Sequence, residues 1–275
     1  MNIQAPCIVN FETREEIGSL GLSFSGDFHD FIEGDLNIEA DVGVLLPTYC
    51  EAANMEKLIS EIENLDLSLC ILVLDDCSPD GTANIARVLQ KKYKNILLFN
   101  RPEKTGLGTA ITDGFKIFLA LEKPPKYIVT MDADYSHNPR DIPRIVATAK
   151  EGKGLAIGSR YRRGGRIENW SVFRLATSRV ANLIASIVVR APIRDHTSGF
   201  RCYSTRLVKT IVPDLHCQTY EIQIETIRQA VRRRFNVREV PIIFMNRKKG
   251  KSKLSFNEIK EFVSYAFFRA ILHRH

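Results

Sequence analysis

The sequence lacks any cysteine arrangement that would indicate a zinc site or a disulfide framework. Its six cysteines, at positions 7, 50, 70, 77, 202 and 217, form no Cys-x-x-Cys pair and show no zinc-type spacing with histidine. The N-terminal residues also lack the basic-then-apolar order that is typical of a signal peptide. We therefore expect reduced cysteines and a cytosolic location.

Long hydrophobic runs are missing as well. No stretch reaches the roughly 18 uninterrupted apolar residues that a membrane-spanning helix requires. The best candidate, residues 172–189, is interrupted by Arg174 and Arg179. The sequence therefore predicts a chain that does not span a membrane but is able to lie on one.

Acidic residues are concentrated at the start of the chain and are outnumbered elsewhere. Residues 1–41 contain nine acidic side chains and one base, Arg14, whereas the 275 residues together carry a net charge of +7. The remaining residues therefore carry +15, an excess that favours anionic partners. Nucleic acid, nucleotide phosphates and an anionic membrane are all compatible with this charge.

A regular alternation of apolar strands and amphipathic helices begins at Asp41. Short β-rich runs occupy residues 42–46, 69–74, 96–99, 127–131 and 155–158, and helical periodicity occupies 54–64, 82–92, 108–121 and 140–150. This order predicts an α/β fold with a mostly parallel sheet and helices on both faces. We assign residues 41–253 to this domain and residues 1–40 to an acidic N-terminal extension.

The second half of the chain is less regular. It predicts helices over 171–189 and 219–233, a loop over 195–201 and a strand near 237–244, followed by five bases in residues 247–253. Ser255 and Glu258 form a capping box at the start of a last helix. We therefore expect residues 254–275 to form an amphipathic C-terminal helix.

The polar residues that are candidates for binding or catalysis directly follow the predicted strands. Four such loops occupy residues 47–51, 75–82, 132–137 and 159–161. Because ligands bind beyond the carboxyl ends of strands in open parallel sheets, these loops should meet at one edge.

Asp132 and Asp134 form the most informative pair in these loops. Extended geometry would place both carboxylates on one face, where their charges repel unless a cation lies between them. A divalent metal that bridges them to a diphosphate satisfies this requirement. An exposed acidic turn before Pro139 is the alternative interpretation of the same residues.

Two other loops favour structural roles for some of their residues. Asp80 and Thr82 are typical of a turn into a helix, whereas one of the two acids at the strand end, Asp75 or Asp76, is placed to accept hydrogen bonds from a nucleobase. The segment 104–109 lacks the ending and the spacing of a Walker A motif. We interpret it as a turn into a helix, with phosphate binding as the alternative.

Seven motifs in order give the sequence a close resemblance to the dolichol- and polyprenol-phosphate mannose synthases, glycosyltransferases of family two with the Rossmann-like GT-A fold. The resemblance runs from about Val42 to about Ile259 and does not include residues 1–40. The motifs are Pro-Thr-Tyr-x-Glu, Asp-Asp-x-Ser-Pro-Asp-Gly-Thr, Gly-Leu-Gly-Thr-Ala, Met-Asp-Ala-Asp-x-Ser-His, Gly-Ser-Arg-Tyr, Asp-x-Thr-Ser-Gly-Phe-Arg and Gly-x-Ser-Lys-Leu.

The resemblance implies a set of donor-binding residues that surround a nucleotide sugar. Tyr49 would stack on the base and Glu51 would accept hydrogen bonds, while arginine and lysine would neutralise the phosphates. The full donor set is Pro47, Tyr49, Glu51, Leu74, Asp76, Asp132, Ala133, Asp134, Arg160, Arg247 and Lys253.

The same resemblance implies the metal, the acceptor site and the reaction. Asp134, helped by Ser136, would bind Mg²⁺ or Mn²⁺, and Arg174 and Ser178 would bind the phosphate of a polyprenyl acceptor. The enzyme would be an inverting hexosyltransferase that moves mannose from GDP-mannose to a polyprenyl or dolichyl phosphate. Asp132 and Asp134 would act at the catalytic centre. Asp195 is either a catalytic base or a residue that orients its loop.

Two cysteines depart from the family pattern, and one histidine is a candidate for proton transfer. Cys50 stands where asparagine is common, and Cys77 where glycine or asparagine is common. We expect neither to be catalytic. His137 resembles a proton carrier, and capping of the next helix is the role we favour for it.

The resemblance also implies a peripheral location at the cytosolic membrane face. The C-terminal helix would rest on the membrane surface, or a small membrane subunit would serve the same purpose. A family-two transferase with another sugar nucleotide, such as UDP-glucose, and a non-lipid acceptor is the main alternative. A nucleic-acid-binding module and a pseudo-enzyme are disfavoured, the first because no nucleic-acid motif occurs and the second because the acids and bases of the site are present.

Overall fold

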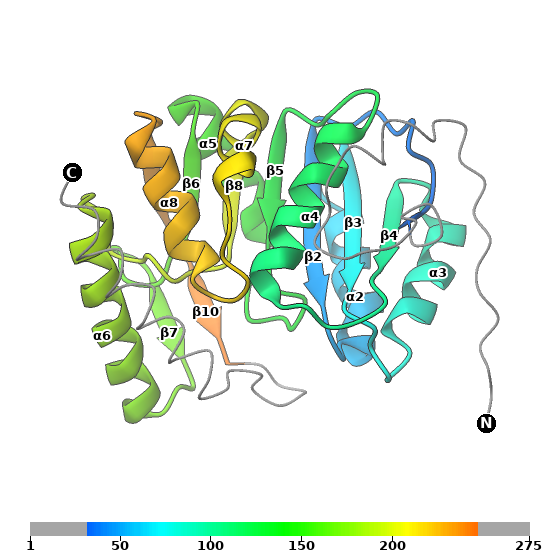
Figure 1. The fold of residues 1–275 in the computed structure, drawn as a ribbon. Coiled ribbons are helices and arrows are strands. Elements are labelled where there is room, and N and C mark those ends of the chain that lie inside the picture. Colours follow the sequence, from blue (N-terminus) through cyan, green and yellow to red (C-terminus); the bar gives the residue numbers. More distant parts are fainter. Residues whose placement is uncertain (1–31, 247–275) are drawn as a thin grey trace.

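The computed structural model describes residues 32–246, and within them a mixed sheet of eight strands forms the centre of the protein (Figure 1). The strand order is β1-β4-β3-β2-β5-β8-β6-β9. The bounds are β1 Ile32–Glu33, β2 Val42–Thr48, β3 Leu69–Asp75, β4 Ile96–Asn100, β5 Tyr127–Thr130, β6 Leu155–Ser159, β8 Arg201–Ser204 and β9 Val237–Pro241.

Within the described residues, six helices of eleven or more residues lie close to the positions that the periodicity predicts, and a seventh helix, α7, was not predicted. They are α2 Ala52–Glu63, α3 Thr82–Lys92, α4 Leu107–Ala120, α5 Ile142–Gly152, α6 Val172–Val189, α7 Thr205–Ile211 and α8 Ile222–Arg232. Two short 3-10 turns complete the set, η2 Pro139–Asp141 and η3 Val212–Asp214. The predicted α/β class, with a mostly parallel sheet and helices on both faces, is confirmed.

The two faces of the sheet bury separate apolar clusters. In β2, Leu45 packs into the cluster that contains Phe115 of α4, whereas Val44 packs into the cluster that contains Leu58 of α2. Successive strand side chains point to opposite faces, so a strand buried on both faces must be apolar at nearly every position. The near-continuous apolar runs in the sequence have this cause.

One central strand was not predicted. β8 lies between β5 and β6 and is antiparallel to both, with Cys202 opposite Val129 and Ala156. Its four residues, Arg-Cys-Tyr-Ser, show no apolar run, although Arg201 and Tyr203 are both fully buried. A small parallel pair, β7 Arg166–Glu168 and β10 Ile243–Met245, forms a second sheet next to the main one.

Residues 32–40 already contact the domain. Ile32 is 1% exposed and pairs with Phe99 of β4, and the Arg87 guanidinium donates to Glu33 at 2.7 Å. The boundary of the acidic extension at residue 40 stays a prediction. The predicted helix over residues 254–275 lies outside the described residues, as does the basic segment 247–253.

Candidate active site

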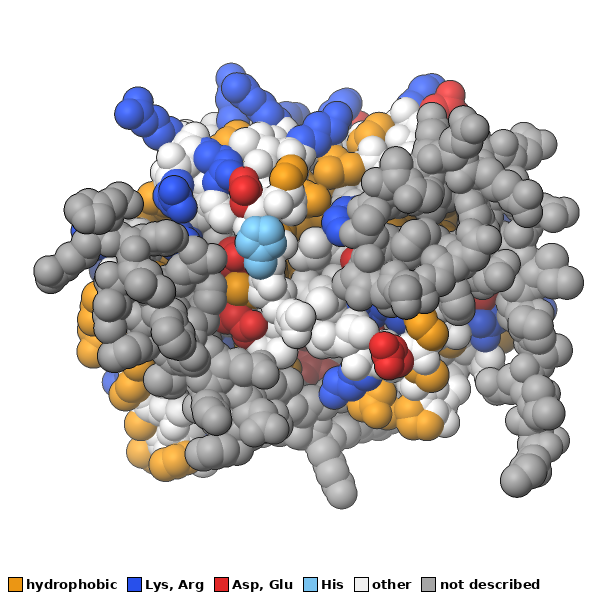
Figure 2. All heavy atoms as spheres, in the orientation of Figure 1, with side chains coloured by type: hydrophobic (Ala, Val, Ile, Leu, Met, Phe, Trp, Pro, Cys, Tyr) orange, Lys and Arg blue, Asp and Glu red, His pale blue; other side chains and the backbone are white. Residues whose placement is uncertain are grey.

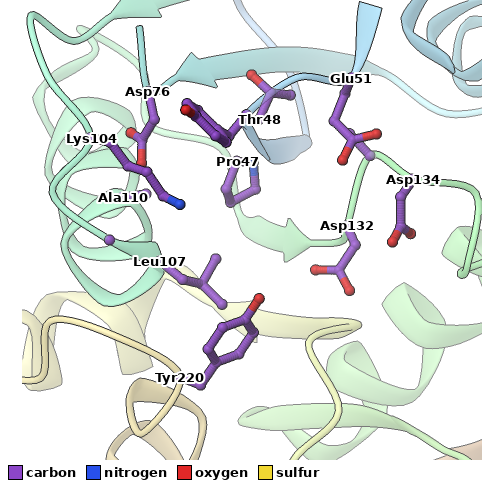
Figure 3. A pocket seen from close by; sticks show the side chains of 13 residues that line it. Pro47, Thr48, Glu51, Asp76, Lys104, Leu107, Ala110, Asp132, Asp134 and Tyr220 are labelled. Carbon is purple, nitrogen blue, oxygen red and sulfur yellow. The ribbon is translucent and has the colours of Figure 1, made fainter. Parts of the chain in front are cut away.

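An open cavity of about 110 Å³ lies at the carboxyl ends of β2, β3 and β5 (Figure 3). Three of the four strand-end loops predicted from the sequence contribute side chains to it. The lining residues are Pro47, Thr48, Tyr49, Glu51, Asp76, Lys104, Gly106, Leu107, Ala110, Asp132, Ala133, Asp134 and Tyr220.

The loop that carries Tyr49 and Glu51 is fixed by the neighbouring loop after β3. The backbone N–H of Cys50 donates to Ser78 Oγ at 2.8 Å, and that of Glu51 donates to Thr82 Oγ1 at 3.0 Å. The fully buried Asp75 carboxylate accepts from Ser78 Oγ at 2.6 Å. These contacts confirm a structural role for the loop after β3. Asp75 positions Ser78, a role that the sequence did not reveal.

Two cysteines in these loops adopt the left-handed backbone conformation, with φ of 56° at Cys50 and 53° at Cys77. Glycine and asparagine tolerate this conformation best. The residues common at these positions in the resembling family are therefore those that the backbone favours. Cysteine is small enough to occupy them.

Asp76 is held at the cavity by a buried arginine that no motif contained. Arg101, 1% exposed, donates from Nε to Asp76 Oδ1 at 2.6 Å and from Nη1 to Thr109 Oγ1 at 2.8 Å. Its Nη2 donates to the carbonyl of Gly106 at 3.1 Å. Burial raises the pKa of Asp76 above its usual value, although Arg101 opposes this shift. Arg101 therefore joins Asp76 to the turn at Gly106 and to the first turn of α4.

The glycine-rich turn before α4 packs against a distant loop and does not bind phosphate through Gly108. The N–H of Gly108 donates to the carbonyl of Gln218 at 2.8 Å, and a Cβ at Gly108 would lie 2.2 Å from the carbonyl oxygen of Cys217. This contact brings Tyr220 to the cavity, where its ring lies across from Asp132 in Figure 3. The interpretation of this segment as a turn into a helix is confirmed.

Lys104 and Tyr49 meet over the cavity. The Lys104 Nζ lies 4.4 Å from the centroid of the Tyr49 ring, within cation–π distance. Glu51 is 7% exposed and accepts from Asn54 Nδ2 at 3.0 Å. Leu74, in contrast, is fully buried within β3 and is absent from the cavity lining. The structure therefore brings Pro47, Tyr49 and Glu51 together and leaves Leu74 in the core.

The Asp132-Ala133-Asp134 segment leaves β5 and turns at Tyr135, whose φ is 62°. Both carboxylates point toward the cavity in Figure 3, but their exposure differs: the Asp132 side chain is 44% exposed and Asp134 is 6% exposed. The N–H of Ser136 donates to Asp134 Oδ1 at 2.9 Å, and Ser136 Oγ is buried without a hydrogen-bond partner in the structure. The predicted ligands Asp134 and Ser136 therefore lie together in this segment, and the Ser136 hydroxyl makes no hydrogen bond in the structure.

His137 stabilises this segment from beneath. Its Nδ1 accepts from the N–H of Asp132 at 3.2 Å, and its ring stacks on Phe200 with centroids 5.1 Å apart. The residue that caps the following 3-10 turn is Asn138, which accepts from the N–H of Arg140. The capping role that we favoured for His137 is therefore wrong, because its buried ring faces the backbone of Asp132.

Asp195 lies in an ion pair that leaves it no exposed surface. Its two oxygens accept from Arg160 Nε at 2.8 Å and from Arg160 Nη2 at 2.7 Å, and the Arg160 backbone N–H adds a third bond at 2.9 Å. Burial alone would raise the pKa of Asp195, but the Arg160 guanidinium lowers it below its usual value. The geometry favours a role in orienting Arg160 and its loop over a role as base.

The predicted acceptor residues lie on the inner face of α6. Arg174 Nη1 donates to Asn246 Oδ1 at 2.9 Å, and its guanidinium lies 4.1 Å from the centroid of the Trp170 ring. Ser178 Oγ accepts from the Tyr161 hydroxyl at 2.8 Å. Neither residue lines the cavity described above. Arg247 and Lys253 lie outside the described residues, so their roles stay predictions.

Within residues 32–246, no group of three or more histidine, cysteine, aspartate and glutamate side chains is arranged to hold a metal ion. Mg²⁺ is often bound by one or two carboxylates together with substrate phosphates. A site that Asp134 and Ser136 share with a diphosphate has this composition.

Comparisons with known proteins identify relatives of this chain. The sequence is 36% identical over 220 residues to a polyprenol monophosphomannose synthase of Mycolicibacterium smegmatis, with 79% of this chain and 82% of the relative covered. It is 35% identical over 230 residues to a dolichol-phosphate mannosyltransferase of Pyrococcus furiosus, covering 82% of this chain and 62% of that protein's length.

A solved structure shares the fold at much lower identity. Glucosyl-3-phosphoglycerate synthase of Mycobacterium tuberculosis, in complex with Mn²⁺, UDP-glucose and phosphoglyceric acid, superposes with a TM-score of 0.61 at 16% identity, with 86% of this chain and 81% of that chain covered. This likeness supports the GT-A fold.

The family model described as "Glycosyl transferase family 2" matches residues 43–212. This range includes Asp76, Asp132, Asp134 and the Arg160–Asp195 pair. Together with the two relatives, this match establishes that the chain is a glycosyltransferase and belongs to glycosyl transferase family 2.

Proposed function

We propose that this glycosyltransferase moves mannose from GDP-mannose to a polyprenyl or dolichyl phosphate with the help of a divalent metal. The observation that carries the proposal is the cavity itself. Asp76 lies on one side and Asp132 and Asp134 lie on the other (Figure 3), and Tyr49 also lines the cavity. The names of the two relatives supply the sugar and the class of acceptor.

The donor binds with its base between Tyr49 and Asp76 and its diphosphate toward Asp134. Because Arg101 occupies Asp76 Oδ1, the other oxygen of Asp76 is the one available to a base N–H. The half-exposed Asp132 faces the sugar. For the ring of Tyr49 to stack on a base, Lys104 moves off its face and becomes available to a phosphate.

The residues present fit a divalent metal such as Mg²⁺ or Mn²⁺. Asp134 supplies a carboxylate at the cavity, and Ser136 supplies a buried hydroxyl oxygen that lacks a hydrogen-bond partner. When bound, the metal neutralises charge on the departing nucleotide diphosphate. His137 and the Ser136 N–H hold the backbone and carboxylate of this segment in place.

The acceptor phosphate attacks the anomeric carbon directly, since it is already anionic and needs no strong base. Arg174 and Ser178 hold this phosphate, and the paired Asp195 keeps Arg160 oriented beside them. Attack opposite to the departing diphosphate inverts the anomeric centre. A peripheral position on the membrane gives the enzyme access to such a lipid.

Thermal stabilisation by a panel of sugar nucleotides, each with and without Mn²⁺, tests the donor and metal assignments. We expect the largest shift in melting temperature with GDP-mannose and Mn²⁺, and no metal-dependent shift in Asp134→Ala. Full metal-dependent stabilisation of that variant would refute the metal assignment. Preference for UDP-glucose would support the alternative donor.

Incubation of labelled donor with polyprenyl phosphate in detergent tests the acceptor assignment. Transfer of the sugar into the organic phase supports a lipid phosphate. Donor hydrolysis or transfer to soluble acceptors, with no lipid product, would instead favour a non-lipid acceptor.

A further inference from the structure

Two cysteines lie beside residues of the cavity, and the proposed reaction uses neither of them. Cys50 stands between Tyr49 and Glu51, which both line the cavity, and Cys77 directly follows Asp76, which lines it as well. A covalent change at these cysteines would therefore act on residues of the proposed donor site.

The register of the sheet brings the two cysteines to the same level. Strands β2 and β3 are parallel, and their last pair of opposed residues is Thr48 and Asp75. Cys50 and Cys77 each lie two residues beyond that pair. Neighbouring strands are about 4.8 Å apart, which falls within the roughly 4.4–6.8 Å that separates the Cα atoms of a disulfide.

Two hydrogen bonds keep these segments together beyond the ends of the strands. The N–H of Asp76 donates to the carbonyl of Thr48 at 3.0 Å, which extends the ladder by one residue. The N–H of Cys50 then donates to Ser78 Oγ at 2.8 Å, so Cys50 contacts the residue that follows Cys77. The two cysteines therefore lie on adjoining segments that are already bonded to each other.

Exposure distinguishes this pair from the other cysteines in the described part of the chain. Cys77 is exposed and Cys50 is partly buried, whereas Cys70, Cys202 and Cys217 are all buried. Burial raises the pKa of Cys70 to about 12 and also raises the pKa of Cys202, so neither forms the reactive thiolate near neutral pH. A thiol reagent in solution therefore reaches Cys77 and Cys50 first.

The backbone at both positions would strain a bridge between them. Cys50 and Cys77 both have positive φ, a conformation that suits asparagine and glycine better than cysteine. Strained or exposed disulfides are reduced easily, unlike the disulfides that stabilise secreted proteins. A bridge at this place would therefore form and break reversibly.

The surroundings of the pair favour oxidation over metal binding. Among the side chains of residues 32–246, no cluster of three or more His, Cys, Asp and Glu is arranged to hold a metal ion. The chain carries a net charge of +7, and Lys and Arg side chains line the upper edge of the face in Figure 2. A positive net charge attracts a small anionic disulfide such as oxidised glutathione.

We propose that Cys50 and Cys77 are a redox-sensitive pair, and that a disulfide between them weakens donor binding. The Cys77 thiolate attacks one sulfur of oxidised glutathione and releases one reduced glutathione, which leaves a mixed disulfide on the protein. The Cys50 thiol then displaces a second reduced glutathione and closes the protein disulfide, so the protons of both protein thiols leave with the two glutathione thiols. Closure moves Tyr49, Glu51 and Asp76 from their places around the cavity, and its effect on donor binding rests on the proposed function.

Mass spectrometry of the full chain in a Cys7→Ser background tests the bridge. Cys7 lies outside the described residues, and its removal excludes it as an alternative partner. After treatment with oxidised glutathione, we expect the intact mass to fall by that of two hydrogen atoms, and a digest to contain a linked peptide with Cys50 and Cys77. Dithiothreitol should reverse both changes.

Calorimetry tests the effect on donor binding, with GDP and Mn²⁺, or with UDP if the thermal panel favours it. We expect the oxidised protein to bind the nucleotide about tenfold more weakly than the reduced protein, because the bridge moves preorganised contacts. The matched control is the double variant Cys50→Asn, Cys77→Gly, which carries residues that the backbone favours at these positions. It should bind the nucleotide as the reduced protein does, both before and after oxidation.

Three results would overturn the proposal. One is a protein without the internal bridge after oxidation, whether unmodified or with glutathione on Cys77. Another is a bridged protein that binds the nucleotide as tightly as the reduced protein, and the third is an equal loss of binding in the oxidised double variant. Absence of nucleotide binding by the reduced protein would instead refute the proposed function, and mass spectrometry would still decide the bridge.

Discussion

The active site depends on buried charged residues that are each fixed by several partners. Arg101 bonds to four groups on three segments, and Asp195 accepts three bonds from Arg160 alone. A buried charge with good partners is stable, but removing a partner leaves the remaining charge unsatisfied. Substitutions at these residues should therefore affect ligand binding and stability together, and conservative changes are needed to separate the two.

Replacement of Arg101 by lysine should weaken binding of the donor nucleotide. Lysine keeps the positive charge but lacks the planar fork that reaches Asp76, Thr109 and the Gly106 carbonyl at once. We expect about a tenfold rise in the dissociation constant of the nucleotide diphosphate, measured by calorimetry. Arg87→Lys, at the surface pair with Glu33, is the control and should bind normally. Normal binding by Arg101→Lys would show that Asp76 needs no such anchor.

Ser136→Ala should lower the affinity for the metal without disturbing the fold. The Ser136 hydroxyl is buried and has no hydrogen-bond partner in the structure, so its removal breaks no bond there. We expect Mn²⁺ affinity in the presence of nucleotide to fall by about tenfold. Titration of Mn²⁺ against the melting temperature measures this effect, and an unchanged midpoint would remove Ser136 from the metal site.

At the scale of elements, the long buried strands and amphipathic helices were predictable, and the short elements were not. β8 and β7 have four and three residues, too few to show a period, whereas the strand predicted near 237–244 is divided between β9 and β10. The buried Arg201 of β8 is satisfied by carbonyls that only the tertiary fold supplies. The cavity residues after β2, β3 and β5 followed from the rule that strand ends meet at one edge.

The same rule, applied to β4, would have identified Arg101. That residue directly follows Asn100, the last residue of the strand. Tyr220 had no such signal. It reaches the cavity only because its loop packs on the Gly106–Gly108 turn, a contact between segments more than 100 residues apart.

Gly108→Ala should destabilise the protein at this contact between elements. A Cβ there would lie 2.2 Å from the Cys217 carbonyl oxygen, so the loop that carries Tyr220 would have to move. We expect a loss of about 2–4 kcal/mol in the free energy of unfolding, measured by urea denaturation. Gly152→Ala is the control, because its Cβ would meet only the Arg238 side chain at 3.4 Å or more. Equal stability of the two variants would mean that the loop yields easily.

At the scale of the whole molecule, the cavity and the predicted acceptor residues lie beside different halves of the sheet. The loops after the parallel strands β2, β3 and β5 line the cavity of the proposed donor site. Arg160 follows β6, Asp195 lies in the loop before β8, and the predicted acceptor residues lie on α6. The loop over residues 195–201 joins the halves, because it bonds to α6 through His196 and lies against Asp132 through Gly199. A change in this loop should therefore affect both the proposed donor site and the predicted acceptor residues.

The pH dependence of unfolding should report on this joining loop. His196 is 1% exposed, and both of its ring nitrogens lack hydrogen-bond partners in the structure. Burial, and then repulsion from Arg201, lowers its pKa from 6.5 to about 4. Between these values the unfolded chain binds a proton that the folded chain does not, so the free energy of unfolding falls as the pH falls from about 6.5 to 4.

The slope from His196 should approach about 1.4 kcal/mol per pH unit within that window. His196→Gln should lose this contribution, so its unfolding free energy should depend less steeply on pH, even if it is lower than that of the wild type at neutral pH. Urea denaturation at a series of pH values measures both slopes. His216→Gln, at an exposed position, should keep the wild-type slope. If His196→Gln and the wild type lost stability in parallel, the buried imidazole would not be the group that takes up the proton on unfolding.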